Sequence, residues 1–286
     1  MYDVIVIGRG PAGVSSAIYA VRAGKKTLLI GKGVSAAESA KEVGNFYGTG
    51  GTVSGAELHS RAIAQAASLG VEFKDEEVNS VEMTGSFTVD TDSGSYDCKA
   101  VVLAVGRRRA SSGVKNTDTF EGRGVSRCAV CDGFFFKNKT LGVLGAGSYA
   151  AHEAKQLMSI TDKITIFTNG MEFTGGAPPC GINKQKVKSV FGEAKLGGVE
   201  LENGEKILLD GLFIAVGTAD ALDLAKKLGL ATDGGYLTVD KNGMTSCPGV
   251  FAAGDCVGGL NQISTAVGDG ALAGQRAAEY ISKTAE

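Results

Sequence analysis

The amino-acid sequence predicts an α/β protein made of two similar modules, each a parallel sheet covered by helices. Two strand-sized apolar stretches, Tyr2 to Ile7 and Thr140 to Leu144, each run into a glycine-rich turn and then into a helical pattern. A strand that ends in Ala-Val-Gly also occurs twice, at Ala100 to Gly106 and at Phe213 to Gly217, which indicates that the two modules are related. With 286 residues, 43% of them hydrophobic, the chain is long enough for two packed cores.

The first glycine-rich turn has the spacing of a dinucleotide-binding fingerprint. Gly8-Arg9-Gly10-Pro11-Ala12-Gly13 follows the first strand and leads into the helical pattern Val14 to Ala23. Its glycines allow a tight turn, a close approach of the backbone to a pyrophosphate and close packing of the helix on the strand. The next strand, Lys26 to Ile30, ends at Gly31-Lys32-Gly33, where many such folds carry an acid for the ribose hydroxyls. The nearest acid is Glu38, so adenosine recognition there would depend on backbone groups or on that residue.

The rest of the first module is predicted as a loop, a helix and an antiparallel excursion. Val43 to Gly48 is rich in glycine, and a helical pattern runs from Gly55 to Leu69. Short strand patterns then lead to the apolar strand Ala100 to Val105, which is followed by Gly106. The strands of the excursion are Glu72 to Lys74, Ser80 to Thr84, Ser86 to Thr91 and Tyr96 to Lys99.

The second module has its own fingerprint, which runs from Gly145 to Ala150 and leads into a helix from Ala151 to Met158 and a strand from Lys163 to Phe167. Its glycines serve either to bind a nucleotide or merely to pack the helix against the strand, and both interpretations stay open. Met171 to Ile182 then lacks clear periodicity, so the second module looks abbreviated. The residues of this candidate second nucleotide site are Gly145, Gly147 and Ala150.

The last third of the chain contains a hairpin and a second helix start. Asn203-Gly204 is a strong hairpin turn between strands at Gly198 to Glu202 and Lys206 to Leu209. Further on, the strand at Gly249 to Asp255 ends in Gly-Asp, and an amphipathic stretch from Gln262 to Ser282 follows. A carboxylate placed there can bind a polyol, and the helix start can face a phosphate or the edge of a ring system.

Near the middle of the chain stands a CxxC pair with an acid attached, Cys128-Ala129-Val130-Cys131-Asp132. Two cysteines at this spacing can close a small disulfide ring where the backbone opens a helix, and the helix start stabilises a thiolate. Half of a zinc site has the same spacing, but a structural zinc site needs two more Cys or His ligands nearby. The remaining cysteines and histidines are scattered, which favours redox chemistry over a metal. They are Cys98, Cys180, Cys247, Cys256, His59 and His152.

Charge and hydropathy limit the partners and the location. The formal net charge of −2 gives no indication of nucleic-acid binding. Between Arg107 and Lys139, however, eight basic residues face three acids, a local net charge of +5 that would attract an acidic partner to the CxxC. No apolar run is long enough to span a bilayer, and no export signal follows Met1, so we expect a cytoplasmic protein.

Five motifs occur in a fixed order along the chain. They are GxGPAG at Gly8 to Gly13, NFYG and SGAEL within Asn45 to Leu58, CAVCDG at Cys128 to Gly133, the second GxGxxA, and GVFAAGDC with QISTAxGxG within Gly249 to Gly270. In this order they resemble the low-molecular-weight thioredoxin reductase family of flavoproteins over nearly the whole chain. The resemblance implies two Rossmann-like nucleotide-binding domains, in which a discontinuous FAD domain, residues 1–110 and 242–286, receives the CxxC-bearing domain, residues 111–241, as an insertion.

The same resemblance implies a cofactor, partners and roles for particular residues. The chain would bind FAD, Cys131 would face the flavin, Cys128 would attack a partner's disulfide and Asp132 would carry the proton. The acceptor would be thioredoxin or a similar protein, and the enzyme would be a homodimer. The implied FAD-binding residues are Gly8, Gly10, Pro11, Ala12, Gly13, Asn45, Gly106, Gly254, Asp255, Gln262 and Ile263.

Departures from the family pattern concern the electron donor. Members that use NADPH carry a basic cluster after the strand that follows the second fingerprint, because guanidinium groups hold the 2′-phosphate. Here Thr168 to Thr174 contains no basic residue, and the strand end has no acid to suit NADH. Asn261 also stands where the family usually has an arginine before Gln262. The chain is therefore similar to the branch that takes electrons from ferredoxin, and the basic segment around the CxxC would suit an acidic ferredoxin.

Three alternatives remain beside a ferredoxin-dependent enzyme: a diflavin oxidoreductase with a second FAD in the second module, an NAD(P)H-dependent thioredoxin reductase, and a non-catalytic flavoprotein redox sensor. The intact Cys128, Cys131 and Asp132 favour an enzyme over a sensor. Both histidines are interpreted as structural or surface groups. The aromatic run Phe134 to Phe136 is interpreted as core or domain-interface packing.

Overall fold

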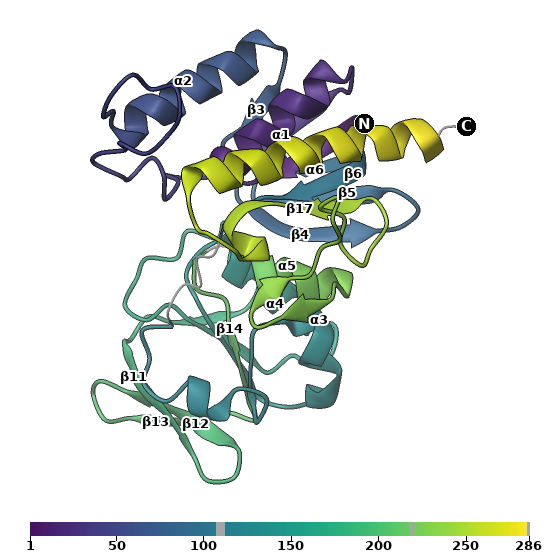
Figure 1. Ribbon diagram of the computed structural model, residues 1–286. Helices are drawn as coiled ribbons and strands as arrows, with labels where there is room; N and C mark the ends of the chain where they lie inside the picture. Colours follow the sequence, from purple (N-terminus) through teal and green to yellow (C-terminus); the bar gives the residue numbers. More distant parts are fainter. Residues whose placement is uncertain (107–111, 218, 220, 285–286) are drawn as a thin grey trace. The chain divides into compact units, whose positions relative to one another are not determined.

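The computed structural model describes residues 1–106, 112–217, 219 and 221–284. The chain divides into two compact units, the first made of Met1–Arg108 and Asp220–Glu286 and the second of Arg109–Ala219. The second unit is thus inserted into the first, as the resemblance implies (Figure 1). The return to the first unit comes earlier than the expected residue 242. Helix α5 (Ala221–Leu228) already belongs to the first unit, where Lys227 Nζ donates to the carbonyl of Asn79 at 3.0 Å.

Within the described residues, the first unit is built on a seven-stranded sheet in the order β3-β2-β1-β6-β5-β4, with β17 also paired to β6. One strand, β6, joins its two parts. The start of β6 pairs antiparallel with β5, whereas its end pairs parallel with β1 and β17. The two strands predicted at Tyr96 to Lys99 and Ala100 to Val105 are therefore one continuous strand. The bounds are β1 Tyr2–Ile7, β2 Thr27–Ile30, β3 Glu72–Lys74, β4 Val78–Met83, β5 Phe87–Thr91, β6 Ser95–Leu103 and β17 Val250–Ala252.

Helices α1 (Pro11–Arg22) and α6 (Ile263–Thr284) run beside each other against this sheet (Figure 1). Small residues let their backbones approach closely: a Cβ on Gly274 would lie 2.1 Å from the Ser16 carbonyl oxygen. Ser16 Oγ also donates to the Gly270 carbonyl at 2.9 Å. A continuous buried core, mostly of alanine and valine side chains, joins both helices to the sheet. Helix α2 spans Gly55–Ser68, one residue shorter than predicted, and Ser54 caps it by accepting the Glu57 N–H at 3.1 Å.

The second unit contains a parallel sheet and an antiparallel sheet. The parallel sheet has the order β10-β9-β8-β14-β7, and the antiparallel one has the order β11-β12-β13. The predicted hairpin is confirmed, because β12 and β13 pair antiparallel across Asn203-Gly204 and Gly204 has φ +86°. The bounds are β7 Val125–Ser126, β8 Leu141–Leu144, β9 Ile164–Phe167, β10 Gly181–Asn183, β11 Val187–Gly192, β12 Leu196–Leu201, β13 Lys206–Leu208, β14 Gly211–Ile214, α3 Ala129–Asp132 and α4 Ser148–Leu157.

Short elements complete the chain. They are the 3₁₀ helices η1 Asp118–Phe120, η2 Gly133–Phe136 and η3 Gly254–Val257 and the strand pair β15 Thr232–Asp233 and β16 Tyr236–Leu237. In the part of the chain that the structure describes, no helix combines the length and the apolar character needed to cross a membrane.

Candidate active site

In the first unit, the turn after β1 packs so closely that two of its positions, Gly8 and Gly13, admit only glycine. A Cβ on Gly8, where φ is +109°, would lie 2.2 Å from the Ala104 carbonyl oxygen, and a Cβ on Gly13 would lie 1.7 Å from the Gly8 carbonyl oxygen. Gly10, in contrast, has no protein atom within 4 Å of its Cβ position, and no side chain caps the start of α1. The turn therefore leaves open space beside uncapped backbone donors, where a pyrophosphate can bind.

A second segment from the other end of the chain meets this turn. Gly254, at the start of η3, has φ +78°, and a Cβ there would lie 2.8 Å from the Ala12 Cβ. Asp255 follows Gly254 and is half-buried. Asp269 lies near it: the burial of Asp269 raises the pKa of its carboxyl, and the charge of Asp255 acts in the same direction. Pro11 begins α1 beside these residues, and Gly106 comes two positions after Ala104. This combination of open glycine backbone and a carboxylate fits the pyrophosphate and ribityl chain of FAD.

Two of the predicted cofactor residues that are far apart in sequence are brought together. Asn45 Nδ2 donates to Gln262 Oε1 at 2.9 Å, so the loop before α2 is tied to the start of α6. Ile263, the first residue of α6, follows directly and is half-buried. The hydrogen bond thus brings Asn45 to the start of α6, and the role of both residues in binding FAD stays a prediction.

Beyond the first fingerprint, Glu38 lies beside a histidine. Its Oε2 is 3.6 Å from His59 Nε2, and burial lowers the pKa of His59, an effect that Glu38 opposes and Arg9 reinforces. Glu38 is held in place because it accepts the Ser35 N–H at 3.3 Å while its own N–H donates to Ser35 Oγ at 3.1 Å. His59 is 6% exposed, which agrees with its interpretation as a structural group.

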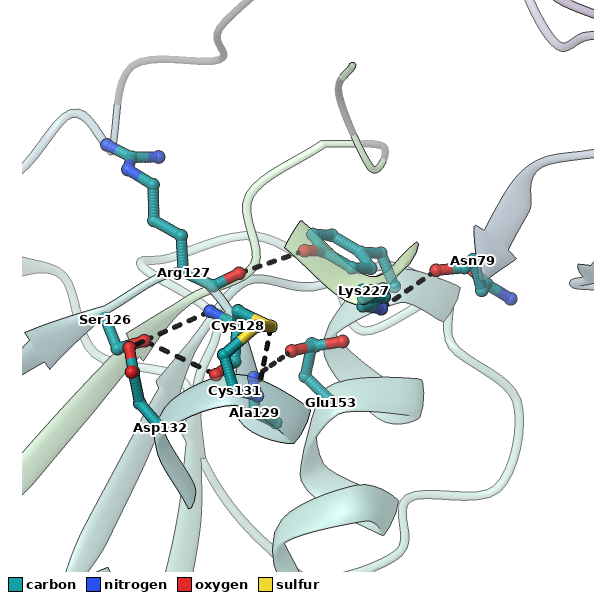
Figure 2. Close-up of a disulfide and its surroundings, with 10 residues drawn as sticks. Asn79, Ser126, Arg127, Cys128, Ala129, Cys131, Asp132, Glu153 and Lys227 are labelled. Atoms are coloured by element: carbon teal, nitrogen blue, oxygen red, sulfur yellow. Dashed lines mark hydrogen bonds between the residues drawn. A yellow bond between two sulfur atoms is a disulfide. The ribbon is translucent and has the colours of Figure 1, made fainter. Parts of the chain in front are cut away.

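In the second unit, Cys128 and Cys131 form a disulfide at the start of α3 (Figure 2). Cys128 is the N-cap residue of α3, and its Sγ accepts the Cys131 N–H at 3.2 Å, so the predicted helix start at the CxxC is confirmed. The two sulfurs differ in access, since Cys128 is 1% exposed whereas Cys131 is exposed. A backbone donor directed at Cys128 Sγ would stabilise a thiolate on that atom.

Asp132 is held beside the disulfide by a serine. Ser126 Oγ donates to Asp132 Oδ2 at 2.6 Å and accepts the Cys128 N–H at 3.1 Å, as Figure 2 shows. Because Ser126 ends β7, the sheet fixes both the carboxylate and the disulfide turn. Sequence reasoning identified Asp132 but not Ser126, whose role depends on a two-residue strand too short to recognise from its pattern.

A second carboxylate, which sequence reasoning missed, lies on the other side of α3. Glu153, on α4, accepts the Ala129 N–H at 2.8 Å through Oε2 and is only 1% exposed. One signal could have identified it: Glu153 is three residues after Ala150 and four before Leu157, so it lies on the apolar face of its helix. An acid on that face predicts a buried partner.

The aromatic run after the CxxC is mostly exposed. Phe134 and Phe135 are 79% and 76% exposed, and Val130, inside the CxxC, is 58% exposed. Phe136 instead packs edge-on against Phe213, with 5.6 Å between ring centroids. Of the two predicted roles, core packing is thus wrong for Phe134 and Phe135 and confirmed for Phe136, while packing at a domain interface stays a prediction. Val130, Phe134 and Phe135 form what we call the apolar patch beside Cys131.

The second fingerprint has the packing geometry of the first. A Cβ on Gly145 would lie 2.0 Å from the Ala215 carbonyl oxygen and 2.9 Å from the Ala150 Cβ. The Cβ position of Gly147 has no protein atom nearer than 4.0 Å, and no side chain caps the start of α4. The segment that follows β9 packs against the carbonyl oxygens of this turn, since Thr174 N–H donates to the Ala146 carbonyl at 2.7 Å and a Cβ on Gly175 would lie 2.7 Å from the Gly147 carbonyl oxygen.

Part of the basic segment is neutralised by acids. Arg127 Nε lies 3.8 Å from Glu121 Oε2, and Lys139 Nζ lies 4.0 Å from Asp210 Oδ1. Arg107, Arg108 and Arg109, which contribute to the predicted charge, lie outside the described residues.

The other cysteines are separate from the disulfide. Cys98 and Cys256 are buried, and burial raises the pKa of each thiol to about 12, so both stay protonated. Cys180 and Cys247 are half-buried and unpaired with each other.

Comparison with known proteins gives consistent results. Residues 2–270 match the family described as pyridine nucleotide-disulphide oxidoreductase. The chain is 35% identical to thioredoxin reductase of Listeria monocytogenes, over 100% of this chain and 96% of that protein, and 32% identical to that of Bacillus subtilis with the same coverage. Among solved structures, the atypical thioredoxin reductase TRi from Desulfovibrio vulgaris Hildenborough has 35% identity and a TM-score of 0.93, covering 99% of both chains. A ferredoxin-flavin thioredoxin reductase from Clostridium acetobutylicum has 29% identity and a TM-score of 0.74, covering 99% of this chain and 98% of that one.

Proposed function

This chain belongs to the pyridine nucleotide-disulphide oxidoreductases and, within them, to the low-molecular-weight thioredoxin reductases, and from this we infer that its Cys128–Cys131 disulfide carries electrons from flavin to a protein acceptor. The protein is a flavoprotein oxidoreductase that binds FAD. The observation that carries the proposal is the disulfide at the start of α3 with Asp132 held beside it.

The disulfide residues divide the chemistry between them. The chemistry that bound FAD supplies is the transfer of two electrons to the disulfide, which takes up two protons and becomes two thiols. Cys131, the exposed sulfur, is the one that we assign to the exchange with flavin, and Asp132 passes a proton to or from the departing sulfur. The Cys128 thiolate, stabilised by the Cys131 N–H, then attacks the acceptor's disulfide to form a mixed disulfide. Cys131 resolves this bond, the acceptor leaves as a dithiol, and the enzyme disulfide forms again.

The acceptor that suits the site is thioredoxin or a similar disulfide protein. Val130, Phe134 and Phe135 present the apolar patch next to Cys131, and exposed aromatic side chains of this kind mark protein interaction sites. Cys128 must become more accessible before it reaches a protein disulfide, because it is 1% exposed in the oxidised state.

The donor that we propose is reduced ferredoxin, which would deliver the two electrons one at a time, rather than NADPH. The second module supports this choice, because Thr168 to Thr174 offers no guanidinium for a 2′-phosphate. The similarity to a ferredoxin-flavin thioredoxin reductase is consistent with the choice.

The family resemblance also suggests how the enzyme assembles. We expect a homodimer, the usual assembly of this family. We also place the enzyme in the cytoplasm, where thiols stay reduced, because Cys98, Cys180, Cys247 and Cys256 are free.

Anaerobic absorbance titration of the FAD-loaded enzyme tests the donor. We expect the flavin band to persist with NADPH and with NADH and to bleach with photoreduced ferredoxin. Addition of oxidised thioredoxin should then restore the band, whereas a Cys131→Ser variant should bleach but pass no electrons onward. Rapid bleaching by either pyridine nucleotide would refute the ferredoxin proposal without touching the disulfide chemistry.

A further inference from the structure

Glu153 lies at the redox-active turn without belonging to the set of residues that the proposed reaction uses. Its carboxylate reaches from α4 to the first residue of α3, where it accepts the Ala129 N–H at 2.8 Å (Figure 2). Both partners are buried, since Glu153 is 1% and Ala129 5% exposed. A buried carboxylate carries a desolvation cost that its hydrogen bonds must offset, so its presence here calls for an explanation.

We propose that Glu153 is a positioning residue that holds α3 in place and disfavours negative charge on the sulfurs when the Cys128–Cys131 bond is reduced. The inference rests on the proposed role of that disulfide. By binding the Ala129 N–H, the carboxylate fixes the turn in which the Cys131 N–H points at Cys128 Sγ at 3.2 Å. The carboxylate binds the residue that follows Cys128, so its negative charge disfavours a second negative charge on the nearby sulfur.

This charge has a consequence for the balance between disulfide and dithiol. A thiol with a raised pKa gains less from ionisation as the pH rises, so the reduced form is less favoured at alkaline pH than it would be beside a neutral group. The enzyme dithiol therefore gives up its electrons more readily to an acceptor. Asp132 and Glu153 then differ in role: Asp132 is half-exposed and bound by a hydroxyl, whereas Glu153 is buried and bound to backbone.

The other charged or titratable residues around the turn are unchanged in the variants compared below. Those on or next to α3 are Asp132 and Arg127, the latter paired with Glu121, and those on α4 are Tyr149, His152 and Lys155.

The experiment compares FAD-loaded wild-type enzyme with Glu153→Gln, which keeps an oxygen acceptor for the Ala129 N–H but removes the charge. Each protein is equilibrated anaerobically with dithiothreitol, whose two thiols are oxidised to a cyclic disulfide as the Cys128–Cys131 bond is reduced to two thiols. Acid quenching, alkylation and mass spectrometry give the equilibrium constant. We expect E153Q to favour the reduced form by about tenfold near pH 9 and by less than about twofold near pH 6, because only at alkaline pH are the thiols ionised beside the carboxylate.

The control is Glu193→Gln, which removes one exposed charge from the same unit and should match the wild type. Equal constants for E153Q and the wild type at every pH, or a difference that does not change with pH, would overturn the inference. A Glu153→Asp variant keeps the charge and should retain the wild-type pH profile even if E153Q does not fold; a profile displaced toward the reduced form at alkaline pH in E153D would also overturn it. A wild-type disulfide that does not exchange with dithiothreitol would instead refute the proposed function itself.

Discussion

Gly10 offers a test in which the protein and its cofactor respond differently to one methyl group. The Cβ position of Gly10 has no protein atom within 4 Å, and its φ of −72° and ψ of −178° suit alanine. In the protein alone, Gly10→Ala should gain about 0.4–1 kcal/mol from the stiffer unfolded chain. It should lose a similar amount, roughly 0.5–1 kcal/mol, because alanine is a poor N-cap. The free energy of unfolding of the cofactor-free protein should therefore change little.

The effect on FAD should be large, because the new methyl group would occupy the space through which the pyrophosphate approaches the start of α1. Loss of one hydrogen bond to a charged group costs about 1.5–3 kcal/mol. The dissociation constant should then rise about 10- to 150-fold. At an FAD concentration about 100 times the wild-type Kd, FAD stabilises the wild type by about 2.7 kcal/mol but G10A by only about 0.3–1.4 kcal/mol.

The assay is thermal or urea unfolding of the cofactor-free protein over a series of FAD concentrations, with flavin fluorescence to report Kd directly. Gly181→Ala is the matched control, because its Cβ position is equally open but lies in the second unit. Wild-type affinity in G10A would refute the assignment of the first fingerprint to the FAD pyrophosphate. Gly13→Ala should fail in a different way, since its Cβ would lie 1.7 Å from the Gly8 carbonyl oxygen and prevent folding of the turn.

Three further predictions concern the disulfide turn and the buried histidine. Asp132→Asn should slow reduction of thioredoxin about 100-fold, the usual range for a lost acid or base, while leaving the rate of flavin reduction unchanged, as stopped-flow absorbance would reveal. Phe134→Ala with Phe135→Ala should raise KM for thioredoxin about tenfold or more through lost apolar contact, with kcat nearly constant; unchanged KM would contradict docking at the apolar patch. Burial lowers the pKa of His59, so at low pH the unfolded chain is protonated there while the native state is not. The free energy of unfolding should therefore fall as the pH drops through about 6.5. Urea unfolding at several pH values should show this slope in the wild type and a smaller one in His59→Gln.

The parts predicted well from sequence are those whose information is local. A buried strand, a glycine turn and a helix start follow one another within a few residues in both fingerprints, so Gly8 to Gly13 and Gly145 to Ala150 were recognisable. The CxxC helix start is local in the same sense. Contacts such as Asn45 with Gln262 depend on the packing of distant elements, and only the resemblance to a family pointed to those two residues.

The failures have physical causes as well. A 3₁₀ helix has three residues per turn, so three successive phenylalanines in η2 point in three directions and only Phe136 faces the sheet. Propensity alone does not reveal this. Glu153 escaped notice because an acid in a helix is ordinarily solvated, and its burial depends on α3 lying against α4.

The position of β17 and α6 at the end of the chain bears on how the protein is made. The first unit needs both, since β17 pairs with β6 and α6 packs on α1, yet both are synthesised after the whole of the second unit. The second unit is complete by Ala219, so it can fold while the earlier strands of the first unit still lack their partners. Until β17 and α6 have emerged, the β6 edge and the apolar face of α1 stay uncovered and open to wrong pairing. A chain truncated before β17 should therefore aggregate rather than persist as a smaller flavoprotein.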